Sequence, residues 1–384
     1  MAGTIRIRVP GQWADGWLYK EHLILWTPGG EMYILPMTKL VQFVRQHASA
    51  EFALACDYAI FRTDWKGSEQ FRRLSTVAEF TKTLHFGFGA VGPSAMMTVK
   101  CEPTPVPGDP VPGSLLDASL YANRVYLGST DGLFETRFDP DKPKYSHPLI
   151  RRLDCEISAL STKYSVINAS AGELGLRFAP VSFDDTNWWR QDWSFVTTAE
   201  CSFDNSFASF HVLNYTGEPF PAFLKAETKP GRRRGRAEFS ESEVVGYRPT
   251  VEIGDLITSS ITGAERAEAL GNAGNRLLLR CPDVLRVVSI SVNRDGDIAA
   301  RIDRRYSSSA GQDALSSPVL KAHAVGAGFV LETVGGMRLF TPRGSYQLSS
   351  ERSVRVRTFV NARRHQDTVL AVNNEEVSLY GFLE

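Results

Sequence analysis

From residue 118 to the C-terminus, the chain repeats one unit: two short strands of alternating apolar and polar residues joined by a tight turn. The unit recurs roughly every 40 residues, a period typical of repeat architectures. Because a single hairpin cannot bury its apolar face, evenly spaced hairpins are expected to stack on one another. The clearest copies lie at residues 123–138, 163–178, 285–302, 328–340 and 367–380.

The last residue of each turn serves as an anchor for the repeat, and glycine there supplies a positive φ at little cost. The anchors are Gly132, Gly172, Gly217, Gly296, Gly336 and Asn374. The gap between Gly217 and Gly296 is roughly two periods, so a further copy is predicted near 250–270. Apolar residues six positions before and after an anchor, such as Tyr126 and Phe138, predict hairpins that are buried on both faces.

A similar hairpin is predicted near the start, at His22–Leu35. Counting it gives about eight hairpins and a central estimate of about seven four-stranded blades, with six or eight left open. The chain ends directly after the predicted strand at 377–382, so the last blade would lack its outer strand. Residues Thr4–Val9 alternate in the required way and are predicted to fill that place, which would also remove exposed sheet edges.

The repeat is interrupted between residues 37 and 114. Segment 37–47 carries apolar residues at helical spacing, and segment 67–84 carries them about every third position, so both are predicted to be short amphipathic helices. We predict a strand at 56–61 between them. Segment 103–113 is too rich in proline to pair in a sheet, and we expect an extended connection there.

The repeat length and the phase of the hairpins resemble the β-propeller superfamily in the broad WD40-like sense, over about residues 118–384. The resemblance implies an all-β propeller with a small helical insertion. The expected parts of this one domain are 1–36 as first strand and hairpin, 37–114 as the insertion, and 115–384 as repeated blades. The Gly-His and Trp-Asp signatures of WD40 blades are absent, so only architecture is implied. The competing fold is a pair of stacked antiparallel sandwiches.

Composition excludes some classes of function. The 43 basic and 43 acidic side chains give a formal net charge of +0, so neither nucleic acid nor a membrane surface is favoured as a partner. The N-terminus is predicted to be a strand rather than a signal peptide, and no window is apolar enough to span a membrane. Five widely spaced cysteines without a C-x-x-C pair favour reduced thiols in a cytoplasmic protein. The seven histidines are scattered, so no metal or cofactor is predicted.

The densest aromatic cluster lies in segment 183–195. Tryptophan and arginine are enriched at binding hot spots because each buries a large area and keeps a polar group. Packing between blades, contact with a partner protein and stacking on a sugar all remain open for this segment. The candidate partner-binding residues here are Trp188, Trp189, Arg190 and Trp193.

Segment 229–236 is the one concentrated basic run, and it is followed by several glutamates. A solvated loop, an acidic protein surface and nucleic-acid phosphates are all compatible with it. The absence of interleaved aromatic residues argues against base stacking. The candidate residues are Arg232, Arg233, Arg234 and Arg236.

These features favour a non-catalytic scaffold or adaptor that docks one or more proteins in a cytoplasmic assembly, for example a prokaryotic regulatory or defence complex. The alternative is a hydrolase or lyase that acts on a sugar or lactone at the channel mouth, because propeller sites are assembled from single residues on many blades. A third hypothesis is nucleic-acid contact through 229–236. Any small-molecule ligand stays unidentified at this point.

Overall fold

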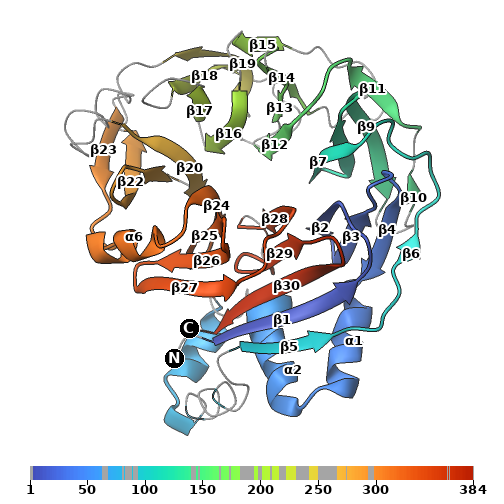
Figure 1. The fold of residues 1–384 in the computed structure, drawn as a ribbon, viewed down its shortest axis with the longest axis vertical. Helices are drawn as coiled ribbons and strands as arrows, with labels where there is room; N and C mark the ends of the chain where they lie inside the picture. Colours follow the sequence, from blue (N-terminus) through green and yellow to red (C-terminus); the bar gives the residue numbers. More distant parts are fainter. Residues whose placement is uncertain are drawn as a thin grey trace. The chain divides into compact units, whose positions relative to one another are not determined.

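The fold was obtained as a computed structural model (Figure 1). It describes residues 3–62, 68–79, 82, 89, 94–139, 144–145, 148–163, 166–172, 174–181, 194–197, 201–207, 210–215, 222–230, 242–249, 266–273, 275–292, 298–360, 362 and 364–383. The chain divides into two compact units. Unit 1 comprises Met1–Pro110, Asp139–Tyr145 and Ser317–Glu384, and unit 2 comprises Val111–Phe138 and Ser146–Ser316.

Unit 2 contains four antiparallel sheets, whose strands follow one another in the chain except that the two-residue strand β10 (Lys144–Tyr145) comes between β9 and β11. Their strands are β7 (Leu115–Tyr121), β8 (Arg124–Ser129), β9 (Gly132–Asp139) and β11 (Ile150–Leu153); β12 (Ala159–Lys163), β13 (Val166–Ser170), β14 (Leu176–Pro180) and β15 (Ser194–Thr197); β16 (Cys201–Phe207), β17 (Phe210–Tyr215), β18 (Ala222–Pro230) and β19 (Ser242–Pro249); and β20 (Glu268–Ala273), β21 (Arg276–Arg280), β22 (Leu285–Val292) and β23 (Ile298–Ile302). One short helix, α6 (Ser308–Ala314), follows the last strand.

Unit 1 contains three sheets. The first has the order β2-β3-β4-β6, the second β24-β25-β26-β27, and the third β28-β29-β30-β1-β5. Their strands are β1 (Gly3–Pro10), β2 (Asp15–Tyr19), β3 (His22–Trp26), β4 (Met32–Pro36), β5 (Ser94–Thr98), β6 (Thr104–Pro105), β24 (Val319–Val325), β25 (Gly328–Thr333), β26 (Gly336–Thr341), β27 (Gly344–Ser349), β28 (Arg355–Thr358), β29 (Val369–Val372) and β30 (Glu376–Leu383); β10 (Lys144–Tyr145) also falls in this unit.

Successive sheets within each unit contact one another through their first strands. In unit 2, β12 contacts β7 and β16, and β16 contacts β20; in unit 1, β28 contacts β24 and β2. This is the blade packing of an all-β propeller with four-stranded blades, and it confirms the fold class predicted from the repeat. The seven sheets formed by the described residues lie within the predicted range of six to eight.

The apolar positions around the anchors occupy the cores between these sheets. Most of the described side chains six positions before and after an anchor are at most 5% exposed, among them Tyr126, Val166 and Val330 before it, and Phe138, Phe178 and Tyr380 after it. Two described positions after an anchor differ: Ile302 is half-buried and Pro342 is exposed. Gly336 shows why an anchor is glycine. Its φ is +110°, and an added Cβ would lie 2.1 Å from the carbonyl oxygen of Ser349, so a side chain at this position would clash with the neighbouring strand.

One sheet in unit 2 has a different phase from the one predicted. The residues around Gly296 separate β22 from β23, the third and fourth strands, whereas the anchoring hairpin is β21–β22. Its turn, Cys281–Val284, has no glycine, which is why the pattern missed it. The copy predicted near 250–270 partly overlaps β20, and residues 250–265 lie outside the described residues. In a meander, each pair of neighbouring strands shows the same alternation, so periodicity alone does not fix the phase.

The prediction that the N-terminal strand completes the C-terminal sheet is confirmed. β1 pairs antiparallel with β30 from Gly3↔Leu383 to Pro10↔Glu376. Its side chains alternate as the sequence indicated: Ile5, Ile7 and Val9 are fully buried in a core cluster of unit 1. The opposite face is polar and carries two arginines.

The helical insertion is also confirmed, with differences in detail. It contains α1 (Met37–His47), α2 (Ala50–Cys56), the π-helix η1 (Asp57–Phe61) and α3 (Glu69–Ser75). The strand predicted at 56–61 is wrong, because the buried residues there follow helical rather than alternate spacing: Cys56 and Ile60, one turn apart, both pack into the core. Ser49 caps the N-terminus of α2 by accepting a hydrogen bond from the Phe52 backbone N–H at 3.2 Å.

The proline-rich segment pairs more than predicted. Thr104 and Pro105 form the short strand β6 at the edge of the β2-β3-β4 sheet. A proline is tolerated on an edge strand because no neighbour needs its missing N–H. The insertion therefore interrupts a blade between its third and fourth strands, while β5 pairs in parallel with β1.

The first prediction concerns β1. Replacing Ile7 with alanine leaves a cavity in the unit 1 core and is expected to lower the free energy of unfolding by about 2–5 kcal/mol. Urea unfolding measures the loss. The matched control is Leu320→Ala, since Leu320 is 47% exposed and its truncation is expected to cost less than about 0.5 kcal/mol. Equal losses in the two variants would contradict the assigned role of β1.

Candidate functional site

A groove of about 430 Å³ lies on the helical insertion, entirely within unit 1. One wall is the face of α1 that carries Thr38, Val41, Gln42, Arg45 and Gln46. This face repeats at helical spacing beside the stripe that packs Leu40 and Val44 into the core, so the same helix serves both the fold and the groove.

The floor of the groove is apolar and held by buried contacts. Met37 is 3% exposed and Phe61 5% exposed, and both belong to the unit 1 core cluster. His365 lies beside them, with its Nδ1 3.0 Å from the carbonyl oxygen of Ile60. Because a carbonyl only accepts, Nδ1 of His365 carries the proton. The floor is therefore a fixed surface.

The rim of the groove carries two ion pairs. Arg45 contacts Asp57 at 2.8 Å between α1 and η1, and Arg364 contacts Glu21 at 2.9 Å. Arg45, Arg364 and Glu21 are exposed and Asp57 is partly buried, and ion pairs at the surface contribute about 0–1 kcal/mol to stability. Their main consequence is geometric, because each holds a polar side chain at the border of an apolar floor. A partly apolar pocket with a polar border is typical of a binding surface.

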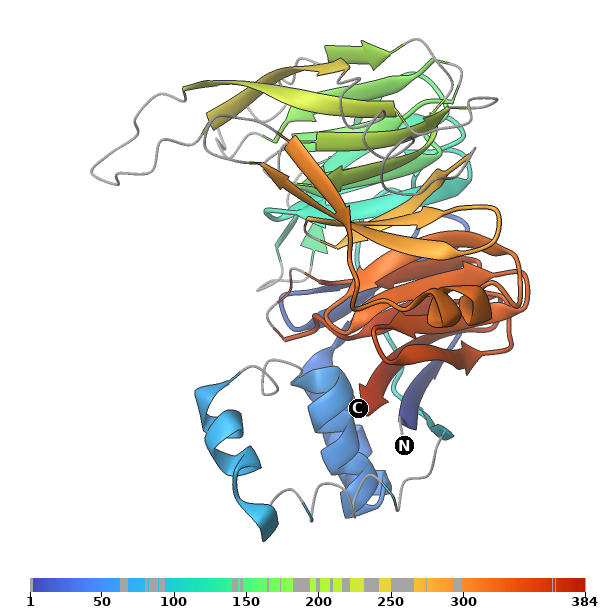
Figure 2. The same ribbon diagram turned by 90° about the vertical axis from the view of Figure 1, so that its left-hand side faces the viewer.

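The helix α3 of the insertion is exposed. α1, α2 and η1 bury their apolar residues against the sheets, whereas α3 stands apart from the sheets of unit 1 in Figure 2. Leu74 on α3 is 40% exposed, and Val77 just after it is 48% exposed. Sequence periodicity predicted an amphipathic helix here but not which helices of the insertion would remain uncovered.

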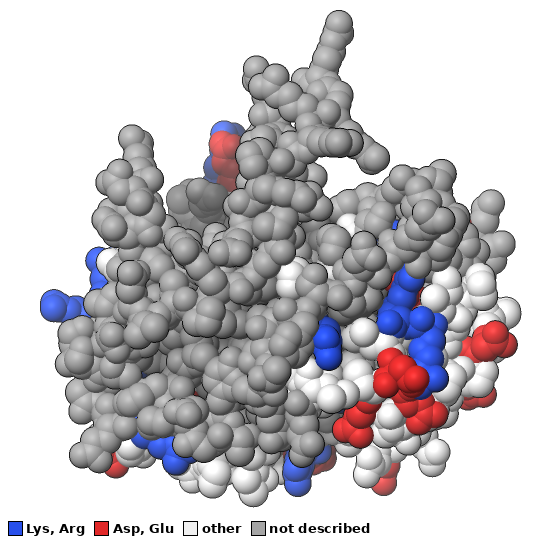
Figure 3. Space-filling model, turned by 90° about the horizontal axis from the view of Figure 1, so that it is seen from above, with Lys and Arg blue, Asp and Glu red and all other residues white. Residues whose placement is uncertain are grey.

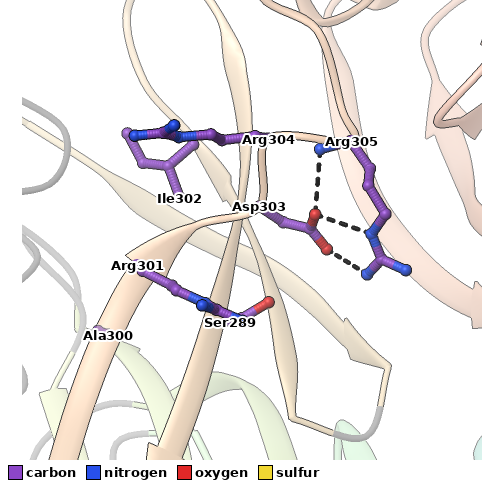
Figure 4. Close-up of a pocket in the computed structure, with 7 residues that line it drawn as sticks. All are labelled: Ser289, Ala300, Arg301, Ile302, Asp303, Arg304 and Arg305. Atoms are coloured by element: carbon purple, nitrogen blue, oxygen red, sulfur yellow. Dashed lines mark hydrogen bonds and ion pairs between the residues drawn. The ribbon is translucent and has the colours of Figure 1, made fainter.

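A second cavity, of about 870 Å³, lies along β23 in unit 2 (Figure 4). Three arginines and one aspartate occur within five consecutive residues that line it, Arg301, Asp303, Arg304 and Arg305, together with Ser289 from β22. The sequence analysis missed this cluster because its residues span the end of a strand and are not a continuous basic run.

Asp303 and Arg305 form one ion pair in this cavity. The carboxylate of Asp303 accepts hydrogen bonds from the backbone N–H of Arg305 at 3.1 Å and from its Nε at 2.9 Å, and a further one from Nη2. The hydrogen bond from the Arg305 side chain holds the pKa of Asp303 below its ordinary value. Asp303 is 8% exposed, and its negative charge is paired with Arg305.

Unit 1 contains one more polar cluster, at the first strands of its sheets. His323 on β24 pairs with Glu332 on β25 through Nε2. Arg357 on β28 bonds to Asp15 on β2 at 3.0 Å through Nε, and lies 5.1 Å from the centre of the Trp17 ring. Neither His323 nor Glu332 lines either of the two cavities described above. We interpret these pairs as contacts within and between blades.

The partner-binding residues predicted from the sequence lie outside the described residues. These are Trp188, Trp189, Arg190, Trp193, Arg232, Arg233, Arg234 and Arg236. Both segments stay predictions. On the face drawn in Figure 3, described acidic and basic side chains lie side by side.

Other chemistry is sparse in the part of the chain that the structure describes. No three His, Cys, Asp or Glu side chains there gather in a way that would hold a metal ion. Cys56, Cys101, Cys155 and Cys281 are free thiols, and burial raises the pKa of each, which disfavours the reactive thiolate. Among the described helices, none is long and apolar enough to cross a membrane.

No protein-family model and no curated protein matches the sequence. Solved structures with a similar fold include the β-propeller domain of Cps50 (Swd1) from Myceliophteria thermophila, at 10% identity and a TM-score of 0.41, covering 70% of this chain and 97% of that one. The WD40 domain of Neurospora crassa Pan2 is 8% identical, with a TM-score of 0.46 and coverages of 97% and 89%. Human WBSCR16 is 7% identical, with a TM-score of 0.46 and coverages of 98% and 86%.

The second prediction concerns the pH dependence of stability that His323 causes. Burial lowers the pKa of His323, against the hydrogen bond to Glu332, which raises it. The unfolded chain therefore binds a proton near pH 6.5 that the folded protein resists. Stability is retained above about pH 6.5 and lost as the pH falls from there toward the lower folded-state pKa.

His323→Gln is expected to remove that part of the pH dependence. The measurement is the free energy of unfolding in urea at about pH 7.5 and about pH 5.5. The wild type should lose more stability between the two than His323→Gln, while His47→Gln, at an exposed histidine, should behave like the wild type. Equal losses in the wild type and His323→Gln would show that His323 is not responsible.

Proposed function

We propose that this protein is a non-catalytic protein-interaction scaffold that docks a partner protein through the helical insertion. The groove formed by α1, η1 and His365 carries this proposal, because it combines a buried apolar floor with a polar rim. Interface hot spots are pockets of this kind, into which a partner inserts a large side chain while the rim excludes water. The finer hypothesis is that the assembly is a cytoplasmic multiprotein complex.

Two further features support a protein rather than a small molecule as the occupant. The same insertion exposes Leu74 and Val77, which would extend an apolar contact beyond the groove. The helices are anchored by buried residues such as Leu40 and Ile60, so the surface is rigid before binding. A rigid surface loses less conformational entropy when a partner docks.

The third prediction tests the groove by filling it with a bulky side chain. Gln42 is exposed and lines it, so Gln42→Trp places a bulky ring where the partner would insert. The matched control is Lys39→Trp, on the same helix but outside the groove. With affinity-tagged full-length chains in the native host, a stoichiometric partner is expected with the wild type and Lys39→Trp, and at least about tenfold less with Gln42→Trp. Undiminished recovery with Gln42→Trp would exclude the groove.

The fourth prediction tests the exposed helix separately. Leu74→Glu combined with Val77→Glu is expected to reduce recovery of the same partner, because both changes place charge in an apolar contact. Leu320→Glu combined with Val334→Glu is the control, at two residues that are 47% and 59% exposed elsewhere in unit 1. If both double variants reduce recovery equally, a general loss of solubility explains the effect, and α3 is not a docking element.

A further inference from the structure

The cavity along β23 has more positive charge than its own residues neutralise. Arg301, Arg304 and Arg305 are all exposed, and the one acidic residue, Asp303, is committed to Arg305. Figure 4 shows Arg305 turned onto Asp303, whereas Arg304 extends to the other side, beside Ile302. In the described part of the chain, neither Arg301 nor Arg304 has a side-chain partner. Two guanidinium groups are therefore available to an anion.

The same residues border an edge of their sheet with which no strand among the described residues pairs. β23 is the last strand in its sheet, in the order β20-β21-β22-β23. The backbone N–H of Asp303 donates to Val287 at 2.7 Å, and Ser289↔Arg301 is the next pair but one in the register. Because hydrogen-bonded pairs alternate along an antiparallel ladder, the N–H and C=O groups of Ala300 and Ile302 point away from β22. An extended chain could pair with them.

The charge suits a phosphate group better than a carboxylate. After Asp303 and Arg305 neutralise each other, two positive charges remain on Arg301 and Arg304. A phosphorylated side chain carries about −1.5 to −2 at pH 7 and offers three acceptor oxygens, enough for two guanidinium groups at once. Ser289, on the neighbouring strand, adds a hydroxyl to the same cavity.

A protein ligand is favoured over nucleic acid. Single-stranded nucleic acid is usually bound by a long basic groove with exposed aromatic rings. The aromatic residue next to this cluster, Tyr306, is 6% exposed, and its hydroxyl accepts a hydrogen bond from Arg276 at 3.1 Å. Among the described residues that line the cavity, the positive charge lies at the end of one strand. A single phosphate on an extended peptide matches this arrangement.

We propose that the β23 edge binds a phosphorylated segment of a partner protein, which adds as a strand beside Ala300 and Ile302 and places its phosphate between Arg301 and Arg304. This site lies in unit 2 and does not depend on the groove of the helical insertion. The result obtained with Gln42→Trp therefore neither supports nor contradicts this second site.

The test uses the full chain and fluorescence anisotropy. The probe is a fluorescein-labelled pool of peptides of about nine residues with a central phosphoserine and randomised flanks, compared with the same pool without phosphate. The phosphorylated pool is expected to bind at least about tenfold more tightly. Arg301→Gln combined with Arg304→Gln should weaken its binding at least about tenfold. Arg266→Gln combined with Arg343→Gln, which removes the same charge elsewhere, should leave binding unchanged.

A second variant tests the strand edge. Ala300→Pro removes an N–H that faces away from β22, so the blade keeps its own hydrogen bonds while the peptide loses one. It is expected to weaken binding of the phosphorylated pool while thermal unfolding stays close to that of the wild type. Unchanged binding with Ala300→Pro would overturn strand addition.

Three other outcomes would also overturn the proposal. The first is equal binding of the phosphorylated and unmodified pools. The second is displacement of the bound peptide by inorganic phosphate at a concentration no higher than the peptide's own, which would indicate a site for free phosphate. The third is tight binding of a labelled oligothymidine of about 20 nucleotides that is lost in the Arg301/Arg304 variant, which would assign the cluster to nucleic acid.

Discussion

The pairing of β1 with β30 is the interaction on which the rest of unit 1 depends. It joins residues from opposite ends of the chain, beginning with Gly3↔Leu383. The same strand then pairs in parallel with β5, which belongs to the insertion, so β1 connects the C-terminal sheet to the helical region. Its inward face supplies Ile5 and Ile7 to the core against which α1 and η1 pack. The groove therefore keeps its shape only while this non-local pairing holds.

The outward face of β1 contributes through charge. Glu376 is nearly fully buried and accepts hydrogen bonds from Arg6 at 2.7 Å, from Arg8, and from the Ser378 hydroxyl at 2.7 Å. Removing one partner from such a cluster leaves an uncompensated buried charge, which costs more than the cluster contributes when complete.

Gly381 on β30 makes a second close contact, because an added Cβ would lie 2.6 Å from the carbonyl oxygen of Ala59 in η1. The helix can thus lie directly on the strand.

Buried aspartates join neighbouring blades in both units. In unit 2, Asp117 on β7 accepts a hydrogen bond from the Leu160 backbone N–H on β12 at 2.6 Å. In unit 1, Asp367 accepts one from Ala327 at 3.1 Å, and Asp15 pairs with Arg357. Apolar side chains alone would let blades slide past one another, whereas a carboxylate fixed to one backbone N–H sets their register. These aspartates, like Glu376, are therefore paired with groups of the fold itself.

The sequence predicted the features that local patterns determine, and it missed features that depend on contacts between distant segments. The hairpins, α1 and the N-terminal strand of the last sheet were predictable because alternation and helical spacing are local, and β1 has the alternation its partner needs. The phase of the β20–β23 sheet was not, because the Asp-Gly dipeptide at 295–296 gave a stronger turn signal in the sequence than the glycine-free turn at 281–284. The groove combines Val41, Phe61 and His365, residues from three segments that meet only after folding.

The arginine cluster was missed for a different reason, which also separates structural charge from available charge. Composition counts Arg124, Arg152 and Arg301 alike, yet Arg124 and Arg152 are buried on the two sides of Glu135, whereas Arg301 is exposed beside a strand edge. The formal net charge of +0 therefore describes the whole chain, and it does not describe the charge of any one patch on the surface. Once the paired groups are set aside, Arg301 and Arg304 remain, next to the backbone groups of β23 that face away from β22. A partner that supplies both a strand and a dianion would satisfy both sets of groups together, which neither a free anion nor an uncharged peptide does.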